Sequence, residues 1–283
     1  MADLTSNEEK TCTIVTIVTG ATGVLGGAFV RELLNKEEIA FGREILFLTG
    51  RSEEKLAALK REIASSFPKA DVAYFPADLS SREERNALFE YLETLRGGGV
   101  KVARLVNVAG ADIQKAFEKY TQEKLSFQCG VNFEAAASFC LYAVQHAAKR
   151  AEIINISSVS GIYPMPYFAV YSATKGALTS FSLALRREVK RKGIRVCAVL
   201  PGAMPTREDI KEQIRGQGLW GRLAALPPAT VAKRSLRAAE KNKGKMIIGF
   251  YNKLMNFGTK LLPLSLKMRF IEKRWSKISK DAF

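Results

Sequence analysis

The sequence predicts an α/β protein built on one doubly wound parallel sheet of about seven strands. Short runs rich in β-branched residues alternate along the chain with longer stretches of helical hydrophobic spacing. Strands separated by helices in this way form right-handed βαβ units, whose strands are parallel. The length of 283 residues, with 47% apolar and 25% charged residues, suits a large globular domain with a sizeable core.

The expected elements follow one another in a regular order. We expect strands at 13–19, 45–49, 72–75, 102–107, 152–157, 194–200 and 246–248. We expect helices at 24–35, 53–65, 82–96, 132–149, 168–192 and 230–240. The sequence therefore predicts a main domain over residues 1–249 and a separate basic helical extension over residues 250–283.

Composition argues against several classes of protein. No apolar run reaches 18 residues, so no ordinary transmembrane helix is expected, and the polar start of the chain is unlike a secretory signal. The four cysteines are scattered without a CxxC pair, and the single histidine has no ligand partners in register. This pattern predicts reduced thiols, a cytoplasmic location and no metal site.

A glycine-rich turn follows the first expected strand. Residues 19–27 are Thr-Gly-Ala-Thr-Gly-Val-Leu-Gly-Gly and lead into a helix. Glycines allow a tight turn and close approach of the backbone, and a helix N-terminus offers free N–H groups to a pyrophosphate. The pattern predicts a dinucleotide site, with an ordinary strand–helix turn as the alternative. The expected contacts in this loop are Gly20, Thr22, Gly23, Leu25 and Gly26.

The second expected strand ends in Gly50-Arg51-Ser52, without an acidic residue. An acid at this place would accept hydrogen bonds from the ribose 2′-hydroxyl of NAD, whereas a cation would pair with a 2′-phosphate. We therefore predict NADP(H) as the cofactor, with Arg51 and Ser52 as contacts. An exposed arginine at the start of a helix is the alternative.

Tyr171 and Lys175 are four residues apart, so they share one face of a helix. A nearby cation favours the phenolate, so we expect the tyrosine pKa to be lowered and the phenol to serve as a general acid or base. Tyr120 also has a lysine four residues later, but it has no hydroxyl residue thirteen positions before it. Ser158 occupies that position before Tyr171, at the end of an expected strand.

With these residues the chain resembles the short-chain dehydrogenase/reductase family, which has a Rossmann-type fold, over most of residues 12–250. The resemblance rests on six motifs in family order: the loop from Thr19, Ala77-Asp78-Leu79, Asn107-Val108-Ala109-Gly110, Asn132 opening a helix, Ser158 with Tyr171 and Lys175, and Pro201-Gly202. Two positions depart from the family pattern. Val24 stands where the common loop has glycine, and Val108 replaces a commoner alanine.

The resemblance implies a role for each motif. Tyr171 would be the acid/base, Lys175 would lower its pKa and bind the nicotinamide ribose, and Ser158, with Ser157 as its rival, would orient the substrate carbonyl. Asn132 would hold a water in a proton relay. Further implied cofactor contacts are Asp78, Leu79, Asn107, Ala109, Gly110, Pro201, Gly202 and Thr206. A homodimer or homotetramer is also implied.

The segment between Ser158 and Tyr171 bears on the substrate. Residues 161–170 are apolar and aromatic, and they resemble the same stretch of hydroxysteroid dehydrogenases and ketoacyl reductases. We expect a lipophilic carbonyl or alcohol substrate, with simple packing beneath the site as the alternative, and a mobile lid over residues 203–228. The predicted function is an NADP-dependent oxidoreductase that transfers a hydride to or from this substrate. A cofactor-binding scaffold or sensor with little turnover is the alternative.

Positive charge is concentrated near the C-terminus. The net charge is +16, and residues 207–283 hold 18 Lys and Arg against 6 Asp and Glu. Leu264, Met268, Ile271, Trp275 and Ile278 form one helical stripe with basic residues around it. This pattern predicts peripheral membrane contact through residues 264–280, with packing on the domain or on a second subunit as the alternative. Nucleic acid is not expected, because no recognition motif is present.

Overall fold

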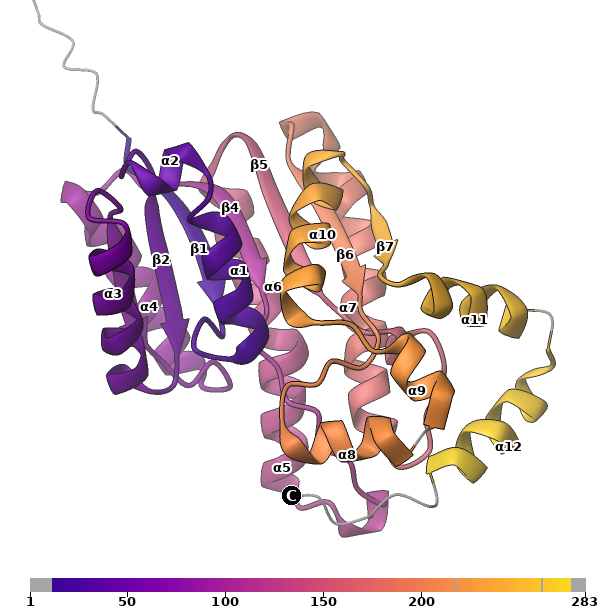
Figure 1. The fold of residues 1–283 in the computed structure, drawn as a ribbon. Coiled ribbons are helices and arrows are strands. Elements are labelled where there is room, and N and C mark those ends of the chain that lie inside the picture. The colour runs from indigo at the N-terminus through magenta and orange to yellow at the C-terminus, as the bar shows by residue number, and fades with distance from the viewer. Residues whose placement is uncertain (1–11, 217, 261, 276–283) are drawn as a thin grey trace, which may run out of the picture.

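The computed structural model describes residues 12–216, 218–260 and 262–275 (Figure 1). One sheet of seven parallel strands runs in the order β3-β2-β1-β4-β5-β6-β7, which confirms the predicted class. The strands are β1 (Ile14–Thr19), β2 (Ile45–Gly50), β3 (Val72–Pro76), β4 (Lys101–Asn107), β5 (Ala147–Ile156), β6 (Arg195–Leu200) and β7 (Lys245–Ile247). The strand order reverses between β1 and β4, and ligands of such sheets bind where that reversal opens a crevice at the carboxyl ends.

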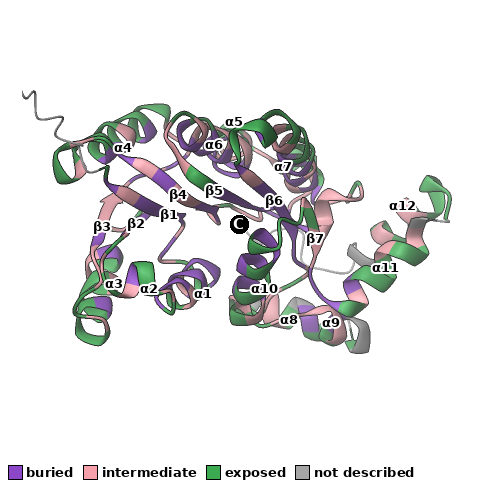
Figure 2. Ribbon diagram, turned by 90° about the horizontal axis from the view of Figure 1, so that it is seen from above, coloured by how far each residue is buried: buried purple, intermediate pink, exposed green. Residues whose placement is uncertain are grey.

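Helices cover both faces of the sheet (Figure 2). One face carries α1 (Val24–Leu33), α2 (Glu37–Ala40), α3 (Glu53–Ser66) and α10 (Pro228–Glu240). The other face carries α4 (Arg82–Thr94), α5 (Gln122–Cys129), α6 (Ala135–Gln145) and α7 (Ala169–Glu188). The carboxyl edge carries α8 (Glu208–Gly216) and α9 (Gly218–Ala224), and an arm of α11 (Phe250–Lys260) and α12 (Leu264–Trp275) leaves the sheet at β7 (Figure 1).

The core consists of two apolar clusters, one on each face of the sheet. Alternation along β1 divides its side chains between them, since Val15 and Ile17 join one cluster and Val18 joins the other. Phe29 of α1 is fully buried in the cluster of Val18, and Phe139 of α6 is fully buried in the cluster of Val15 and Ile17. This packing on both faces fixes the strand ends at one edge.

The expected helix over 132–149 is wrong at both of its ends. The helical segment begins earlier, at α5, and reaches α6 through a π-helical turn over Gly130–Glu134. It ends at Gln145, because the next residues pair with β4: the amide of Val102 donates to the carbonyl of His146, and Val102 is in register with Ala147. Sheet pairing overrides the helix propensity of the two alanines there. Asn132 therefore lies within a helix and does not open one.

The boundary expected at residue 249 falls between β7 and α11, but the first turn of α11 packs into the body. Asn252 is buried, and its side-chain amide donates to the carbonyls of Ala224 and Ile248. Of the predicted stripe, Met268 and Ile271 are half-buried while Leu264 is exposed. The side chain of Trp275 and the whole of Ile278 lie outside the described residues.

Candidate active site at the carboxyl edge of the sheet

The ends of β1 and β4 are tied together at the strand reversal. The Thr19 hydroxyl accepts hydrogen bonds from the amides of Val108 and Ala109, at 3.0 and 3.1 Å. Gly20 has a positive φ of 66°, and a Cβ there would lie 3.0 Å from the Ala109 backbone. Glycine is therefore required by both conformation and space. Thr19 belongs to the glycine motif, yet sequence reasoning assigned it no role.

The start of α1 has the properties of an anion site. Its N-cap, Gly23, has no side-chain capping bond, and its first turn contains no acidic residue. Gly26 allows the helix to approach the loop, because a Cβ there would lie only 2.0 Å from the Gly20 carbonyl oxygen. Val24 is half exposed at the first helical position, so the departure from the family pattern creates no buried clash. The free N–H groups of this turn are suited to bind a phosphate.

Arg51 lies in the open just beyond β2. It is exposed, and its guanidinium lies 5.9 Å from the centroid of the Phe127 ring of α5. Ser52 has a structural task, because its hydroxyl caps α3 by accepting from the amide of Lys55. Arg51 is thus a cation over an aromatic face at the place where the sequence predicted a phosphate contact.

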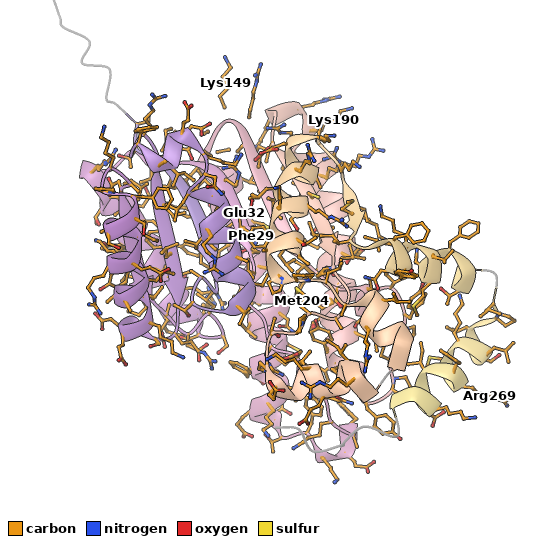
Figure 3. All side chains as sticks on the ribbon, viewed as in Figure 1. Phe29, Glu32, Lys149, Lys190, Met204 and Arg269 are labelled. Atoms are coloured by element: carbon orange, nitrogen blue, oxygen red, sulfur yellow. The ribbon has the colours of Figure 1, made fainter. Side chains whose placement is uncertain are left out.

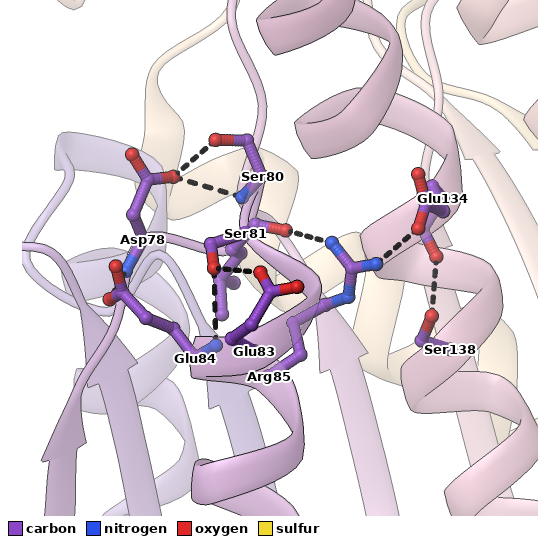
Figure 4. A network of polar contacts seen from close by, with 9 residues as sticks. Asp78, Ser80, Ser81, Glu83, Glu84, Arg85, Glu134 and Ser138 are labelled. Carbon is purple, nitrogen blue, oxygen red and sulfur yellow. Dashed lines mark hydrogen bonds and ion pairs between the residues drawn. The ribbon is translucent and has the colours of Figure 1, made fainter.

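A polar network holds the loop after β3 (Figure 4). The Asp78 carboxylate accepts from the amide and the hydroxyl of Ser80, at 2.9 and 2.7 Å. Arg85 of α4 is 2% exposed, donates to the Leu79 carbonyl at 2.7 Å and pairs with Glu134 of the π-helical turn. Sequence reasoning found Asp78 and Leu79 but missed Arg85, because a buried arginine has no signature in a helix rich in charged residues.

Tyr171 and Ser158 lie together, as the thirteen-residue spacing predicted. Ser158 is buried at the end of β5, and its hydroxyl is close enough to the Tyr171 phenol to act on the pKa of that phenol. The hydroxyl of Ser157 instead donates to the Lys175 carbonyl at 2.7 Å and contacts the Thr179 hydroxyl. Of the two candidate serines, Ser158 is therefore the one whose hydroxyl is beside the tyrosine. The rival tyrosine, Tyr120, donates its phenol to the Ile113 carbonyl in a separate contact.

Lys175 and Asn132 form the floor of the site. The Lys175 ammonium donates to the Ile156 carbonyl at 2.9 Å and lies 6.0 Å from the centroid of the Tyr171 ring. Asn132 is fully buried and holds the Ala111 backbone on both sides, accepting from its amide at 2.7 Å and donating to its carbonyl at 2.8 Å. A Cβ at Gly110 would lie 2.9 Å from Asn132 Oδ1 and 3.2 Å from Lys175 Nζ, so the loop and the floor are in close contact.

The electrostatics of the pair differ from the expectation. We expected Lys175 to lower the pKa of Tyr171, but burial, reinforced by the Asp112 carboxylate, raises the pKa of Tyr171 to about 12, against a smaller lowering by the Ser158 hydrogen bond. Burial also lowers the pKa of Lys175 to about 8, which Asp112 partly opposes. In this arrangement burial is the largest influence on the pKa of both groups, and the phenol carries its proton at neutral pH.

Asn107 lies at the end of β4, but its side chain points into the interior. Its amide donates to the Asn155 side chain at 2.8 Å and to the Ala136 carbonyl at 3.2 Å. Asn155 in turn donates to the Ser182 hydroxyl of α7 at 2.9 Å. This buried network ties β4 and β5 to α6 and α7, so only the backbone of Asn107 faces the ligand edge.

An ion pair that sequence reasoning missed crosses the carboxyl edge. The guanidinium of Arg207 lies 2.9 Å from Asp112, which follows the Asn107–Gly110 motif by two residues. The same carboxylate acts electrostatically on both Tyr171 and Lys175. The pair joins the loop after β4 to the segment that leads into α8, where a lid was expected.

The turn after β6 is held from the arm. A Cβ at Gly202 would lie 2.5 Å from the side-chain nitrogen of Asn252, so only glycine fits at this position. Pro201 is buried and its carbonyl accepts from the amide of Val159, which follows Ser158. Thr206 is half-buried, with its amide bonded to the Met204 carbonyl. The turn thus lies at the same edge as Ser158.

The fold and this site define a nucleotide-binding α/β oxidoreductase. Residues 14–215 match the short chain dehydrogenase family, and the chain belongs to it. A tropinone reductase homolog of Datura stramonium is 32% identical over 193 residues, which cover 67% of this chain and 68% of that protein. The 3beta-hydroxysteroid dehydrogenase 1 of Eggerthella lenta is 33% identical over 197 residues, which cover 67% and 70%.

Solved structures share the fold. A 7beta-hydroxysteroid dehydrogenase superposes with a TM-score of 0.75 at 24% identity, covering 91% of this chain and 96% of that one. The L-sorbose reductase of Gluconobacter frateurii, solved with NADPH and L-sorbose, gives a TM-score of 0.71 at 21% identity, covering 84% and 95%.

Proposed function

We propose that the protein is an NADP(H)-dependent reductase of a lipophilic carbonyl compound, with Tyr171 as the proton donor. One observation carries the proposal. The neighbouring hydroxyls of Ser158 and Tyr171, with the Lys175 ammonium 6.0 Å from the centroid of the Tyr171 ring, lie at the sheet edge where the strand order reverses. Two hydroxyls beside each other can hold one carbonyl oxygen and supply a proton to it.

The residues at the edge fit a dinucleotide. The uncapped start of α1 would hold the pyrophosphate, and the close-packed loops at Gly20 and Gly110 leave backbone on the surface of the crevice. The exposed cation of Arg51 supports a 2′-phosphate and therefore NADP(H). When bound, the nicotinamide supplies the hydride. NADPH also occurs in solved structures of this fold, including that of the short-chain dehydrogenase from Sphingobium yanoikuyae.

The protonation state of Tyr171 is compatible with a role as proton donor in reduction. A phenol with a pKa of about 12 is protonated at neutral pH, so it begins as an acid. The phenol would give its proton to the carbonyl oxygen as negative charge develops there during reduction. The Lys175 ammonium stabilises the phenolate left behind, and Asn132 fixes the Ala111 backbone beside it.

The segment after Ser158 supports a lipophilic substrate. Phe168 is buried and its ring centroid lies 5.8 Å from that of Tyr171. Tyr167 has a positive φ of 65°, a strained conformation, and its carbonyl accepts from the amide of Lys115. We infer that the apolar segment of residues 161–170 faces the carbonyl compound and that α8 and α9 form the lid over the substrate.

Replacement of the phenol tests the proposal. Tyr171→Phe should abolish NADPH oxidation with ketones, since removal of a general acid costs at least two orders of magnitude, while NADPH still binds. Tyr120→Phe is the matched control, because its phenol is bonded elsewhere. If the wild type binds NADPH but oxidises none with ketones, aldehydes, steroids or ketoacyl thioesters, the scaffold alternative replaces the enzyme.

The cofactor choice has its own test. Arg51→Ala should lower kcat/KM for NADPH by at least ten-fold and leave kcat/KM for NADH nearly unchanged, since a charged hydrogen bond to phosphate contributes about 1.5–3 kcal/mol. A wild-type preference for NADH would contradict the assignment.

The assembly and the membrane contact are further parts of the proposal. Leu141 of α6 and Leu183 of α7 expose apolar side chains, which supports a homodimer or homotetramer through these helices. Sedimentation of the wild type beside Leu141→Lys measures the oligomeric state, and a monomeric wild type would refute this assembly. Among the described residues no helix is both long and apolar enough to span a bilayer. Contact of residues 264–280 with a membrane would therefore be peripheral.

A further inference from the structure

A hollow lies between the outer edge of the sheet and the arm of α11 and α12. It has a volume of about 670 Å³. Its apolar walls include Ile162, Pro164, Met246, Ile247 and Leu264. Its polar lining is Tyr163, Lys243, Lys245, Lys253, Asn256 and Lys267. The hollow thus combines four ammonium groups with apolar walls and has no acidic residue in its lining.

The ammonium groups of the hollow have no acidic partner among the described residues. The ion pairs of these residues involve other lysines, such as Lys36 and Lys211, and none includes a lysine of the hollow. The Lys267 ammonium lies instead 5.9 Å from the centroid of the Tyr163 ring. Four uncompensated cations around one hollow favour an anionic ligand.

The outer surface of the arm is apolar and has no partner among the described residues. Phe250, Leu254 and Phe257 of α11 follow one another at steps of four and three, so they share one helix face, and they are 71%, 50% and 68% exposed. Leu266 and Phe270 of α12 are also exposed. Large apolar side chains gathered in this way are typical of an interaction surface.

Charge decides between a second copy of the chain and a lipid surface. Residues 241–275 contain nine Lys and Arg but a single acid, Glu272. A twofold interface would place this patch against itself, so like charges would face each other. An anionic bilayer attracts each of these cations and accepts the exposed apolar side chains at its headgroup boundary.

We propose that the hollow binds the phosphate headgroup of an acidic phospholipid while the exposed face of α11 lies in the membrane interface. This inference names the ligand of the proposed membrane contact and rests on that contact, not on the proposed reaction. Lys253, Lys267 and the Asn256 amide would hold the phosphate, and Ile162 and Leu264 would contact the first part of an acyl chain. The Tyr163 phenol bonds Asn256 at 2.9 Å and Thr259 at 2.6 Å, so the bound lipid would lie beside the substrate-facing segment.

Vesicle flotation of the full chain tests the proposal. The protein should float with phosphatidylcholine vesicles that contain phosphatidylglycerol and stay below with pure phosphatidylcholine. Lys253→Ala with Lys267→Ala should weaken partition by roughly thirty-fold, from about five-fold per lysine at an anionic surface. Lys60→Ala with Lys149→Ala is the matched control and should bind as the wild type. Lys60 is exposed beside the opposite sheet edge, and Lys149 lies at the far end of the strands from Met204 (Figure 3).

A second variant separates the lipid surface from a simple anion site. Phe250→Ser with Phe257→Ser changes exposed side chains only, so its melting temperature should stay within a few degrees of the wild type while flotation is lost. Equal flotation of the lysine and control variants, or dimerisation through the arm without flotation, would overturn the proposal. A rise in melting temperature with inorganic phosphate, without flotation on vesicles, would overturn the proposal as well. Tyr171→Phe should float normally, so failure of the reaction and failure of lipid binding are distinguishable.

Discussion

The contact of Gly110 with the floor of the site leads to a sharp prediction. In Gly110→Ala the new methyl group would lie 2.9 Å from Asn132 Oδ1 and 3.2 Å from Lys175 Nζ. Asn132 has no room to yield, because Ala111 holds it through bonds of 2.7 and 2.8 Å and it also donates to Thr174. Relief to an ordinary contact needs a shift of about 0.5 Å, which breaks at least one of these buried bonds.

The expected cost follows from the broken bond. A buried polar group left without a partner costs about 1–3 kcal/mol, so the free energy of unfolding should fall by that amount. Turnover should fall at least ten-fold, since Lys175 and the loop move together. Thermal unfolding and NADPH oxidation with a ketone measure the two effects. Gly258→Ala is the control, since its Cβ meets nothing within 4 Å in an exposed helix. Wild-type turnover and stability in Gly110→Ala would refute the reasoning.

Three further predictions concern charge. Because burial lowers the pKa of Lys175 to about 8, its ammonium is present below pH 8 and lost above it. Reductive turnover should therefore fall about ten-fold from pH 7 to pH 9, and a flat pH–rate profile would contradict this. Asp112→Asn removes a charge that raises the pKa of Lys175, so the fall in turnover should move to lower pH. The move should be well under one pH unit, because Asp112 is partly exposed and paired with Arg207. A move to higher pH in the same pH–rate profile would contradict this prediction. Arg85→Met should lower the free energy of unfolding by roughly 2–4 kcal/mol and raise KM for NADPH more than it lowers kcat, as measured by denaturant unfolding and steady-state kinetics beside the exposed control Arg82→Met.

Much of the fold follows from local patterns in the chain. The strand of residues 14–19 is predictable because β-branched residues alternate between two apolar layers, and α7 because apolar spacing and a long uninterrupted run agree. The helix α2 is not, because a single turn of four residues is too short to show a periodicity. The start of β5 is decided by pairing with β4, which no local pattern contains.

The site was predictable to the extent that its residues belong to motifs. Ser158, Tyr171 and Lys175 were found by spacing, and they do meet at the sheet edge. The predicted direction of the Tyr171 pKa shift was wrong, because the cost of burying the phenolate depends on neighbouring residues that the sequence alone does not place. The Asp112–Arg207 pair was missed for the same reason, since its partners are 95 residues apart.

The π-helical turn over Gly130–Glu134 has a consequence for how this part of the chain tolerates change in length. Such a turn contains one residue more than an α-helical turn, closed here by the amide of Ala135 on the carbonyl of Gly130. Deleting one residue from it would leave a regular α-helix and rotate everything before it by about 100° relative to α6. The side-chain amide of Asn132 would then swing away from Ala111. The number of residues between α5 and α6 is therefore fixed by the position that Asn132 must occupy, whereas the surface loops can lengthen freely.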